Sequence, residues 1–564
     1  MLSITPSVQS PTAWARMKLA VSSGAAIVGW VAVGTGAVLR TLQAKLRDEV
    51  NVFDFGVAGD GVTDDTAKLQ ACLDANSGKR IKFGDGHTFV ISAAIGPSSE
   101  QYLYGRSKLK AKANAQIGTA MVYADGKNGV DIRQLEFDCN ADNAGANYAV
   151  WFRSGSRNHL ADCNIHDSAQ AGAVFESEVG SSVFNNTLTD CGRATSVAGG
   201  ASTDNHGIMV FSNTAGDDLN GVRVVGNRVK NAYRKAITTY AAGAGIVKNV
   251  TISANEVDGS GLGAIYVGSA PGVTTPQKNI AITGNTLSGN YQHIEVSGCE
   301  DVTVSGNVLS NDTGSGGIAI VECSNTAVNG NKITDSSVHA ISASTSSGQN
   351  KNITITGNVI RRVNTSGSGF GAAIRLENTI NSTVTGNAAT DENGHMTHGI
   401  IESGSSDHNT IAANKVKDAT SANYTTVGAN TSLHATSGKY HGIGKEVPLN
   451  MLHVAGGLSL DDTGLVLSNG TNNDVAIPDS VGTVVLTGPT GAYSITGFAG
   501  GHAGRRVTVI NYNANACTVK HNNAGSSASN RAVGEGSADV VIGGFGKAEI
   551  VYSAVAGNFW YVTK

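Results

Sequence analysis

The chain of 564 residues contains little proline, few aromatic residues and few charges: 8 prolines, 5% aromatic residues and 15% charged residues. Low charge combined with many β-branched residues excludes a disordered chain, and 72 glycines without a three-residue period exclude a collagen-like one. The net charge is −4 and no basic stripe is visible, so no nucleic-acid partner is expected. This composition predicts an all-β protein with many tight turns.

The seven cysteines are widely scattered and form no Cys-x-x-Cys motif. A zinc site and a disulfide framework are therefore not expected, and we expect neither a metal nor another cofactor. The thiols are interpreted as small buried side chains of a protein that folds in a reducing cytoplasm.

One uncharged run, residues 19–39, has 21 residues and is flanked by Lys18 and Arg40. Its length would span a membrane, but it is rich in Gly, Ser and Ala, and the basic residues on both sides define no orientation. We favour a segment buried in an assembly and expect no membrane insertion. A signal or anchor, or a membrane-active element, remains an alternative.

A repeated pattern runs through the central part of the chain: a β-run, Gly-Asn or a near variant, and a second β-run, as in "VRVVGNRV" and "ITITGNVI". The repeated asparagines, spaced 22 to 30 residues apart, are Asn227, Asn255, Asn285, Asn307, Asn331, Asn358, Asn387 and Asn414, with weaker earlier members at Asn164 and Asn186. Such a period in β-branched sequence predicts a parallel β-helix. Asparagines at one corner can stack as a ladder of side-chain amides.

Each coil has another strand ahead of its asparagine, in which an isoleucine or alanine is expected to point inward. Because side chains alternate along a strand, the neighbouring positions face outward. The outward residues that we expect to bind substrate are Trp151, Arg153, Phe211, Tyr240 and Tyr266. Flat apolar rings beside charged groups suit a sugar chain. The alternative is that a loop or a neighbouring subunit covers this strip.

Longer loops accompany the same coils: 18 to 20 residues separate isoleucine from asparagine there, against 13 or 14 further along. Another long excursion, ahead of Ile208, carries Asp204 and His206, and we expect His206 to bind substrate. Glycoside hydrolysis usually needs two carboxyl groups within about 10 Å of each other. Glu176 with Asp204 is the favoured pair, and Glu295, four rungs from Glu176, is an isolated alternative.

The stretch "VFDFGVAGDGVTDDTAKLQ" contains four aspartates and Asp74 follows it, but Asp60, Asp64 and Asp65 lack the spacing of an EF-hand loop. Thr63 or Asp64 is instead expected to cap a helix. The apolar face of that helix would contain Leu69, Cys72 and Leu73 and would cover the first coil of the solenoid.

The stretch "VNVFDFGVAGDGVTDDTAKLQ", followed by "IKFGDGHTFVIS", resembles the start of the pectate-lyase-like β-helix of bacteriophage tailspikes and polysaccharide depolymerases. The preceding "GTGAVLRTLQAKLRDE" resembles the segment that joins a virion-attachment region to that domain. The resemblance implies a right-handed β-helix, a homotrimer located in the virion, and an N-terminus bound to other tail proteins. It also implies recognition of a bacterial surface polysaccharide, which members cleave as endoglycosidases or lyases or only bind.

The predicted domains are an N-terminal attachment segment (1–48), a β-helix start with its capping helix (49–110), the β-helix (111–430), a linker (431–450) and a C-terminal β-domain (451–564). The last segment resembles C-terminal modules of tail proteins, is expected to be sandwich-like, and would trimerise the chain or bind carbohydrate. The expected function is binding and cleavage of capsule or lipopolysaccharide O-antigen during host attachment. A binding-only receptor protein, a structural tail component and a cellular polysaccharide lyase are the alternatives.

Overall fold

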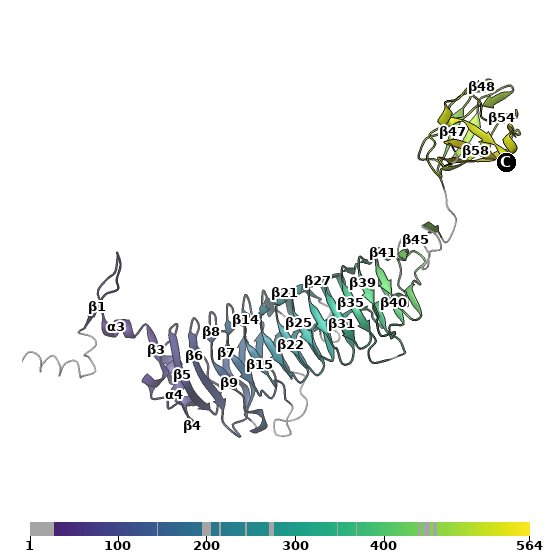
Figure 1. Ribbon diagram of the computed structural model, residues 1–564. Coiled ribbons are helices and arrows are strands. Elements are labelled where there is room, and N and C mark those ends of the chain that lie inside the picture. Colours follow the sequence, from purple (N-terminus) through teal and green to yellow (C-terminus); the bar gives the residue numbers. More distant parts are fainter. Residues whose placement is uncertain are drawn as a thin grey trace, which may run out of the picture. The chain divides into compact units, whose positions relative to one another are not determined.

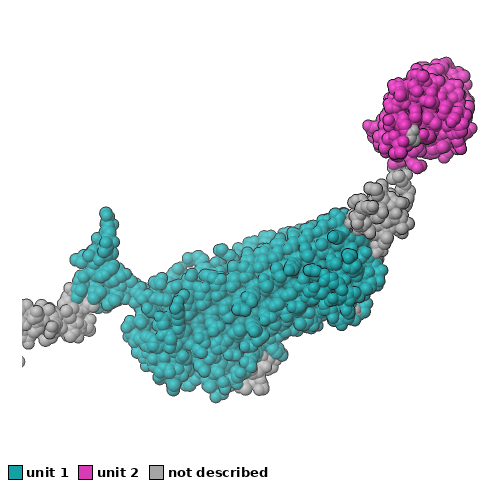
Figure 2. Space-filling view, in the orientation of Figure 1, with its two compact units in different colours: residues 1–455 teal, residues 456–564 magenta. Residues whose placement is uncertain are grey.

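The computed structural model describes residues 28–143, 145–193, 205–213, 216–242, 245–269, 276–346, 348–367, 369–437, 440–443, 452–454, 460–555 and 557–564. The chain divides into two compact units, Met1–Ala455 and Gly456–Lys564 (Figures 1 and 2). In the described part of the chain, no helix is both long enough and apolar enough to cross a membrane.

The first unit is a parallel β-helix in which three rows of strands repeat along the chain (Figure 1). The first row is a sheet of 12 strands: β7 (Ile117–Asp125), β10 (Ala146–Arg153), β13 (Ala173–Glu176), β16 (His206–Ser212), β20 (Lys235–Ala241), β23 (Gly263–Ser269), β26 (Gln292–Ser297), β29 (Gly316–Val321), β32 (Ile341–Ala343), β36 (Ala372–Glu377), β40 (His398–Ser403) and β43 (Ala422–Thr425). We call it the 12-stranded sheet.

The second row contains β8 (Asp131–Arg133), β11 (His159–Ala161), β14 (Ser182–Phe184), β18 (Arg223–Val225), β21 (Ile246–Ser253), β24 (Gln277–Thr283), β27 (Cys299–Ser305), β30 (Ser324–Asn329), β34 (Thr354–Thr356), β38 (Thr383–Thr385), β41 (Thr410–Ala412) and β44 (Ser432–Ser437), with the short strands β17 (Asp218–Asn220), β33 (Asn350–Lys351) and β37 (Thr379–Ile380).

The third row contains β9 (Glu136–Asp138), β12 (Asn164–His166), β15 (Thr187–Thr189), β19 (Arg228–Lys230), β22 (Glu256–Asp258), β25 (Thr286–Ser288), β28 (Val308–Ser310), β31 (Lys332–Ser336), β35 (Val359–Val363), β39 (Ala388–Thr390) and β42 (Lys415–Lys417). The second and third rows join at β6 (Tyr102–Ala111), which pairs with both β8 and β9.

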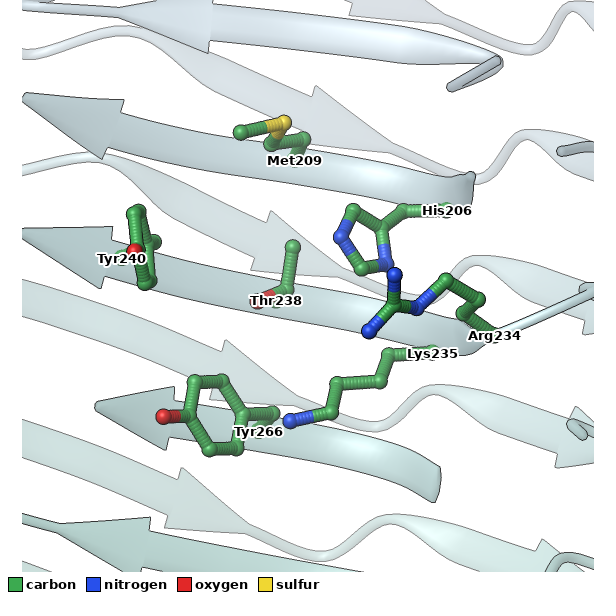
Figure 3. A pocket seen from close by; sticks show the side chains of 7 residues that line it. All are labelled: His206, Met209, Arg234, Lys235, Thr238, Tyr240 and Tyr266. Carbon is green, nitrogen blue, oxygen red and sulfur yellow. The ribbon is translucent and has the colours of Figure 1, made fainter. Parts of the chain in front are cut away.

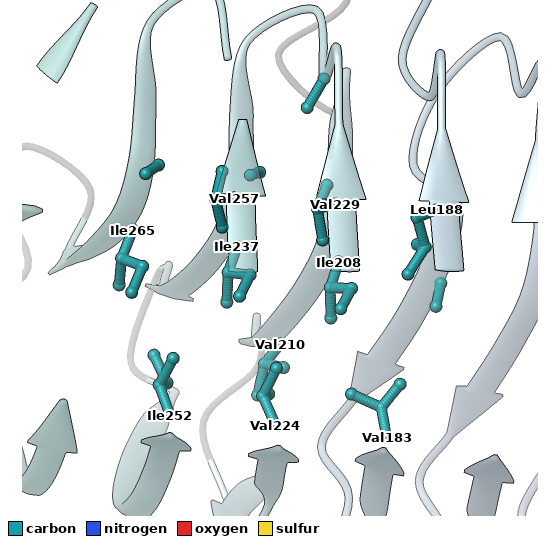
Figure 4. Close-up of a cluster of buried hydrophobic side chains, with 14 of the residues drawn as sticks. Val183, Leu188, Ile208, Val210, Val224, Val229, Ile237, Ile252, Val257 and Ile265 are labelled. Atoms are coloured by element: carbon teal, nitrogen blue, oxygen red, sulfur yellow. The ribbon is translucent and has the colours of Figure 1, made fainter. Parts of the chain in front are cut away.

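The hydrophobic core runs along the inside of these rows. Inward side chains of the same kind stack from coil to coil, as Ile208, Ile237 and Ile265 do in Figure 4. All the inward positions predicted from strand alternation are buried: Ala173, Ile208, Ile237, Ile265, Ile294, Ile318, Ile341, Ile374 and Ile400. Because side chains of the same type stack on neighbouring coils, each coil covers the core of the next one. The core is therefore continuous, although a single coil could not bury its own apolar side chains.

An asparagine ladder occupies the corner between the second and third rows. From Asn186 to Asn414, each side-chain amide donates to the carboxamide oxygen of the next asparagine at 2.9–3.0 Å. The prediction for Asn164 is wrong: Asn164 pairs with Thr187, the residue after Asn186, and is exposed. Cys163 takes the corner position, and its backbone N–H donates to Asn186 at 2.9 Å.

The acidic stretch near the start of the unit supports turns and a covering helix. Helix α4 (Thr66–Ala75) buries Leu69, Cys72 and Leu73 in the core, as predicted. The residue before the helix is Asp65, but its buried carboxylate accepts from the backbone of Ala58 and Gly59 at 2.7 and 2.9 Å and makes no cap hydrogen bond. Asp64, one of the two predicted caps, accepts from the backbone N–H of Thr66, the first residue of the helix, at 3.1 Å. These aspartates therefore satisfy backbone donors.

The remaining N-terminal elements are β1 (Gly29–Trp30), β2 (Arg40–Thr41), α3 (Leu42–Leu46), β3 (Glu49–Asn51), the 3₁₀ helix η1 (Val52–Phe55), β4 (Asp60–Asp64), β5 (Arg80–Ile91) and, after β9, η2 (Ala141–Asn143). Residues 19–27 of the uncharged run 19–39 lie outside the described residues. Its described part contains β1 and exposes Val31, Val33, Val38 and Leu39. All seven cysteines are buried and free, as expected.

The segment predicted as a linker is not free of strands. β44 pairs in parallel with β41 and extends the second row, and β45 (Tyr440–Ile443) pairs with β44 and with β46 (Leu452–Val454). The structure therefore continues the β-helix past the predicted end at residue 430.

The second unit has its own core around Trp560, whose indole N–H donates to Phe498 at 2.7 Å. Its elements are β47 (Asp462–Val466), β48 (Gly470–Asn472), β49 (Val475–Ala476), β50 (Thr483–Thr487), β51 (Tyr493–Ile495), β52 (Phe498–Ala499), β53 (Arg506–Asn511), β54 (Cys517–Val519), η3 (Ala528–Asn530), β55 (Ala532–Gly534), η4 (Glu535–Ser537), β56 (Val540–Ile542), β57 (Lys547–Ser553) and β58 (Phe559–Thr563).

These strands do not form the expected sandwich. β47, β50 and β53 pair in parallel, as do β48, β51 and β54, and β49 with β52. Antiparallel pairing is confined to β56, β57 and β58. The unit is a short three-row parallel coil closed by antiparallel strands, a topology that short strands in sequence do not distinguish from a sandwich.

Candidate functional site

The outer face of the 12-stranded sheet carries two columns of side chains whose register the strand pairing defines. One column contains Tyr123, Trp151, Val174, Met209, Thr238, Tyr266 and Glu295. The other contains Asp125, Arg153, Glu176, Phe211 and Tyr240. The outward placement and neighbouring rungs predicted for the aromatic strip agree with this register.

Glu176 lies in the first of two adjoining pockets, a cavity of about 380 Å³ that we call the Glu176 pocket. Its lining residues are Trp151, Arg153, Glu176, Met209, Phe211, Asn213, Tyr240 and Ala242. Arg153 lies between two carboxylates, with its Nε 3.3 Å from Glu176 and its Nη1 3.8 Å from Asp125. The pocket thus combines aromatic walls with a guanidinium and a carboxyl group.

The Glu176 side chain is almost fully buried, with 10% of its surface exposed. Burial raises the pKa of this carboxyl, while Arg153 opposes the shift and Asp125 and Asp217 add to it. A carboxyl group that holds its proton at higher pH is suited to act as a general acid.

Lys235 lies in the second cavity, of about 260 Å³, which we call the Lys235 pocket (Figure 3). Its lining residues are His206, Met209, Arg234, Lys235, Thr238, Tyr240 and Tyr266. The Lys235 ammonium lies 3.0 Å from the centre of the Tyr266 ring and 3.8 Å from Glu295. Burial lowers the pKa of Lys235 to about 8, although Glu295 favours the charged form.

Met209 and Tyr240 line both pockets, so the two form one groove along the sheet. The aromatic residues pack on one another at its start: the Trp151 ring lies 5.4 Å from Tyr123 and 5.1 Å from Tyr148. Val174 and Met209 are buried in the same outer cluster. Part of the strip is therefore packed, while Trp151, Phe211, Tyr240 and Tyr266 keep partly exposed faces.

The structure brings together most of the predicted site. Trp151, Arg153, Glu176 and Phe211 line the Glu176 pocket, and His206 and Tyr266 line the Lys235 pocket, which Tyr240 shares. Glu295 is four rungs from Glu176, which at about 4.8 Å per rung is about 19 Å, so the two cannot act as one pair. Asp204 lies outside the described residues, and its pairing with Glu176 stays a prediction.

Several residues of the groove were not anticipated from the sequence. Asp125 is in register with Arg153, two rungs from Glu176, and aligning "AMVYAD" with "YAVWFR" would have revealed it. Arg234 and Lys235 come before Ile237, the predicted inward residue of their strand. The prediction considered only the outward positions that follow the inward residue, so it did not include them. The lowered pKa of Lys235 depends on burial, which no local pattern indicates.

Glu178, two residues beyond Glu176, is a contrasting carboxyl group. It is fully buried and accepts from Gly155, Asn158 and Ser181 at 2.9, 2.9 and 2.6 Å. Burial raises its pKa to about 7. Because its partners are all protein groups of neighbouring turns, Glu178 serves the solenoid and not the groove.

Away from the groove, Asp138, His166 and Asp167 each place a ligand atom within 4.8 Å of the others. These groups already have partners. His166 Nδ1 lies 2.8 Å from Asp167, Arg193 lies 3.0 Å from Asp167, and Lys110 lies 3.6 Å from Asp138. The cluster is thus neutralised by side-chain cations.

Three family models match parts of the sequence. They are described as right handed beta helix region (residues 112–275), rhamnogalacturonase A/epimerase, pectate lyase-like (49–134), and periplasmic copper-binding protein (NosD) (266–445). No relative among curated proteins matches.

Solved structures share the fold at low identity. The tailspike protein of E. coli bacteriophage HK620, in complex with a pentasaccharide, is 14% identical and covers 75% of this chain and 86% of its own, with a TM-score of 0.53. The A-module of the Azotobacter vinelandii mannuronan C-5 epimerase AlgE4 is 17% identical, with coverages of 68% and 100% and a TM-score of 0.48. The predicted right-handed parallel β-helix of pectate-lyase-like type is confirmed.

Proposed function

We propose that the protein is a bacteriophage tailspike that binds a bacterial surface polysaccharide along the groove and cleaves it during host attachment. The observation that carries the proposal is the groove itself: aromatic faces and charged groups in register over neighbouring rungs, with the buried Glu176 carboxyl beside Arg153. Sugar rings have apolar faces and polar edges, which such a surface matches.

In this proposal Glu176 donates a proton to the leaving oxygen of the scissile bond. Burial raises the pKa of Glu176, which favours the protonated form that a general acid needs, and the Arg153 Nε lies 3.3 Å from the carboxyl group. Asp204, predicted from the sequence, and Asp125, about 10 Å from Glu176 by rung spacing, are the candidates for a second carboxylate.

The family resemblance of residues 35–92 and the shared β-helix fold support a proposal for the location and assembly of the protein. We infer a homotrimer in the phage tail, synthesised in the host cytoplasm, with residues 1–48 bound to other tail proteins. The second unit would trimerise the chain or bind carbohydrate. Sedimentation of the full chain tests the trimer, and a monomer at micromolar concentration would contradict it.

Cleavage is tested by incubating the purified protein with capsular polysaccharides and O-antigens and measuring chain length by mass spectrometry. We expect one polymer to be shortened, and shortening to be lost in Glu176→Gln and reduced in Asp204→Asn or Asp125→Asn. A polymer that is retained by the protein but keeps its length would identify a binding-only receptor protein. Polymers that are neither retained nor shortened would contradict the proposal.

A further inference from the structure

The Lys235 pocket contains more cationic groups than a neutral sugar requires. Figure 3 shows the Arg234 guanidinium beside the His206 ring, and the Lys235 side chain extending toward the Tyr266 ring. His206 and Lys235 are in register on β16 and β20, and Arg234 precedes Lys235 in the chain. A guanidinium and an ammonium thus line the same cavity, together with His206, Met209, Thr238 and the two tyrosine rings.

The ammonium group of Lys235 is largely buried, yet its N–H groups can still donate hydrogen bonds to a ligand. Its side chain is only 18% exposed, and among the described residues it donates no hydrogen bond. Its nearest carboxylate, Glu295, is 3.8 Å away, and the Tyr266 ring is 3.0 Å from it. Buried charges are normally compensated by hydrogen-bonded partners of opposite charge, so the pocket favours an added anion.

We propose that the Lys235 pocket binds the carboxylate of an acidic sugar unit, and hence that the polymer in the groove is an acidic polysaccharide. This inference rests on the proposed function and names the substrate class of the same groove. Arg234 has the planar fork that matches a carboxylate in two hydrogen bonds, and Lys235 supplies a compact charge beside it. Tyr240 and Tyr266 provide faces for the sugar ring.

A cavity of about 260 Å³ is large enough for one sugar unit, and the adjoining Glu176 pocket is left for other units of the chain. The register places Lys235 two rungs from Glu176 along the solenoid axis and five residues earlier along the strand, because Lys235 pairs with His206 and Glu176 with Phe211. Two rungs span about 10 Å and five residues about 16 Å, so the two backbone positions lie about 19 Å apart. The acidic unit would therefore lie a few sugar units from the bond that Glu176 protonates.

The charge state of Lys235 gives the pocket a pH dependence. The groups that face its ammonium are Glu295 on β26, Tyr266 on β23, His206 on β16 and Arg234 on its own segment. The lysine pKa of about 8 means that the cation is present below pH 8 and is lost above it. Binding of an acidic polymer should weaken as the pH rises from 7 to 9, and binding of a neutral one should not.

The test compares polygalacturonate, alginate and hyaluronan with the carboxyl-reduced, neutral derivative of each. Affinity electrophoresis measures binding to the wild-type full chain, to Lys235→Met and to Lys332→Met, whose lysine is exposed on β31 in the third row. We expect at least one acidic polymer to bind tenfold or more tightly than its neutral form. Lys235→Met should abolish that ratio, and Lys332→Met should preserve it.

The outcomes separate this inference from the proposed function. If the wild type binds or shortens a neutral polymer as well as its acidic form, or if Lys235→Met keeps the ratio, the acidic subsite is wrong while the polysaccharide groove stands. If neither these polymers nor any capsular or O-antigen polymer is retained, both fail. Circular dichroism and the thermal midpoint of Lys235→Met establish that the variant is folded.

Discussion

The asparagine corner and the outer face of the 12-stranded sheet belong to the same coils, yet they differ in how their sequences vary. At the corner, the same residue recurs from Asn186 to Asn414, because each amide bonds to the next. On the outer face, successive rungs carry Trp151, Val174 and Met209, and no residue type recurs on neighbouring rungs of the column from Tyr123 to Glu295. A residue type that recurs on every coil indicates a contact between coils. Residue types that vary from coil to coil on the same scaffold indicate a surface that is not needed for coil stacking.

The two regions also differ in how their polar groups are satisfied. Every amide of the ladder finds its partners within the protein, at distances typical of good hydrogen bonds. In the groove, burial raises the pKa of Glu176 and lowers that of Lys235, so both charges are disfavoured by their surroundings. Shifts of this kind are frequent at functional sites, although buried structural groups show them too, as Glu178 does.

The largest effect that we expect on activity is that of Glu176→Gln. Removing a general acid typically lowers the rate 10²–10⁴-fold, and we expect cleavage to fall about 10³-fold. The thermal midpoint should stay the same or rise, because an amide needs no proton to be neutral. Glu377→Gln is the control, since Glu377 also lies on the 12-stranded sheet and pairs with Arg375 at 2.8 Å. Equal losses in both variants would refute a special role for Glu176.

Asn285→Ala should disrupt the asparagine ladder and leave the residues of the groove unchanged. The change removes the donor to Ile252 and the acceptor for the backbone and side chain of Asn255, all of them buried. Leaving such groups unpaired should cost about 4 kcal/mol in the free energy of unfolding. The control in the same coil is Asn279→Gly, which removes an exposed amide bond to Asn249 and tolerates the positive φ of 56°.

The stabilities of Asn285→Ala and Asn279→Gly are compared by measuring their thermal midpoints at the same scan rate. Asn285→Ala should unfold at a markedly lower temperature and Asn279→Gly within a few degrees of the wild type. Similar midpoints would show that the buried ladder contributes no more than its exposed counterpart.

Glu178→Gln should change how stability depends on pH. Glu178 has a pKa of about 7 in the folded chain against an ordinary value of 4.5, so the folded state binds the proton more tightly. Its contribution is complete below pH 4.5 and is lost as the pH rises to 7, about 3 kcal/mol in all. The variant should be relatively more stable at pH 7 than at pH 4.5. Parallel pH profiles for wild type and variant would contradict this.

The smallest effect is expected for Tyr240→Ala. The ring lines both pockets, and losing one aromatic contact of about 1 kcal/mol should weaken polysaccharide binding roughly five- to tenfold. Affinity electrophoresis measures the change. Tyr512→Ala, which removes an exposed ring in the second unit, should leave binding unaltered. If Tyr512→Ala weakens binding more than Tyr240→Ala, the second unit and not the groove binds the polymer.

The β-helix and its outward residues could be predicted because both follow from local periodicity. Alternation along a strand places Glu176 and Phe211 outward whatever the rest of the chain does. Asn164 was misplaced by one residue because Cys163 fills the corner there, and a cysteine gives no signal of that position. The parallel topology of the second unit depends on which short strands pair, a non-local property.

The charged residues of the groove were harder to predict, because their positions and burial do not follow from the local repeat. Asp125 belongs to a coil without the Gly-Asn signature, so it was not aligned with Arg153. Lys235 begins its strand and resembles any surface lysine in sequence. Its burial against Tyr266, on the next coil, depends on tertiary packing.

A crystal structure of the Glu176→Gln variant with an oligosaccharide of the polymer that the wild type shortens tests the central claim most directly. The variant should keep the ligand intact while binding it. The account predicts sugar units along the outer face of the 12-stranded sheet, across Met209 and Tyr240, with a carboxylate near Lys235. An oligosaccharide bound only on another row or on the second unit would contradict it.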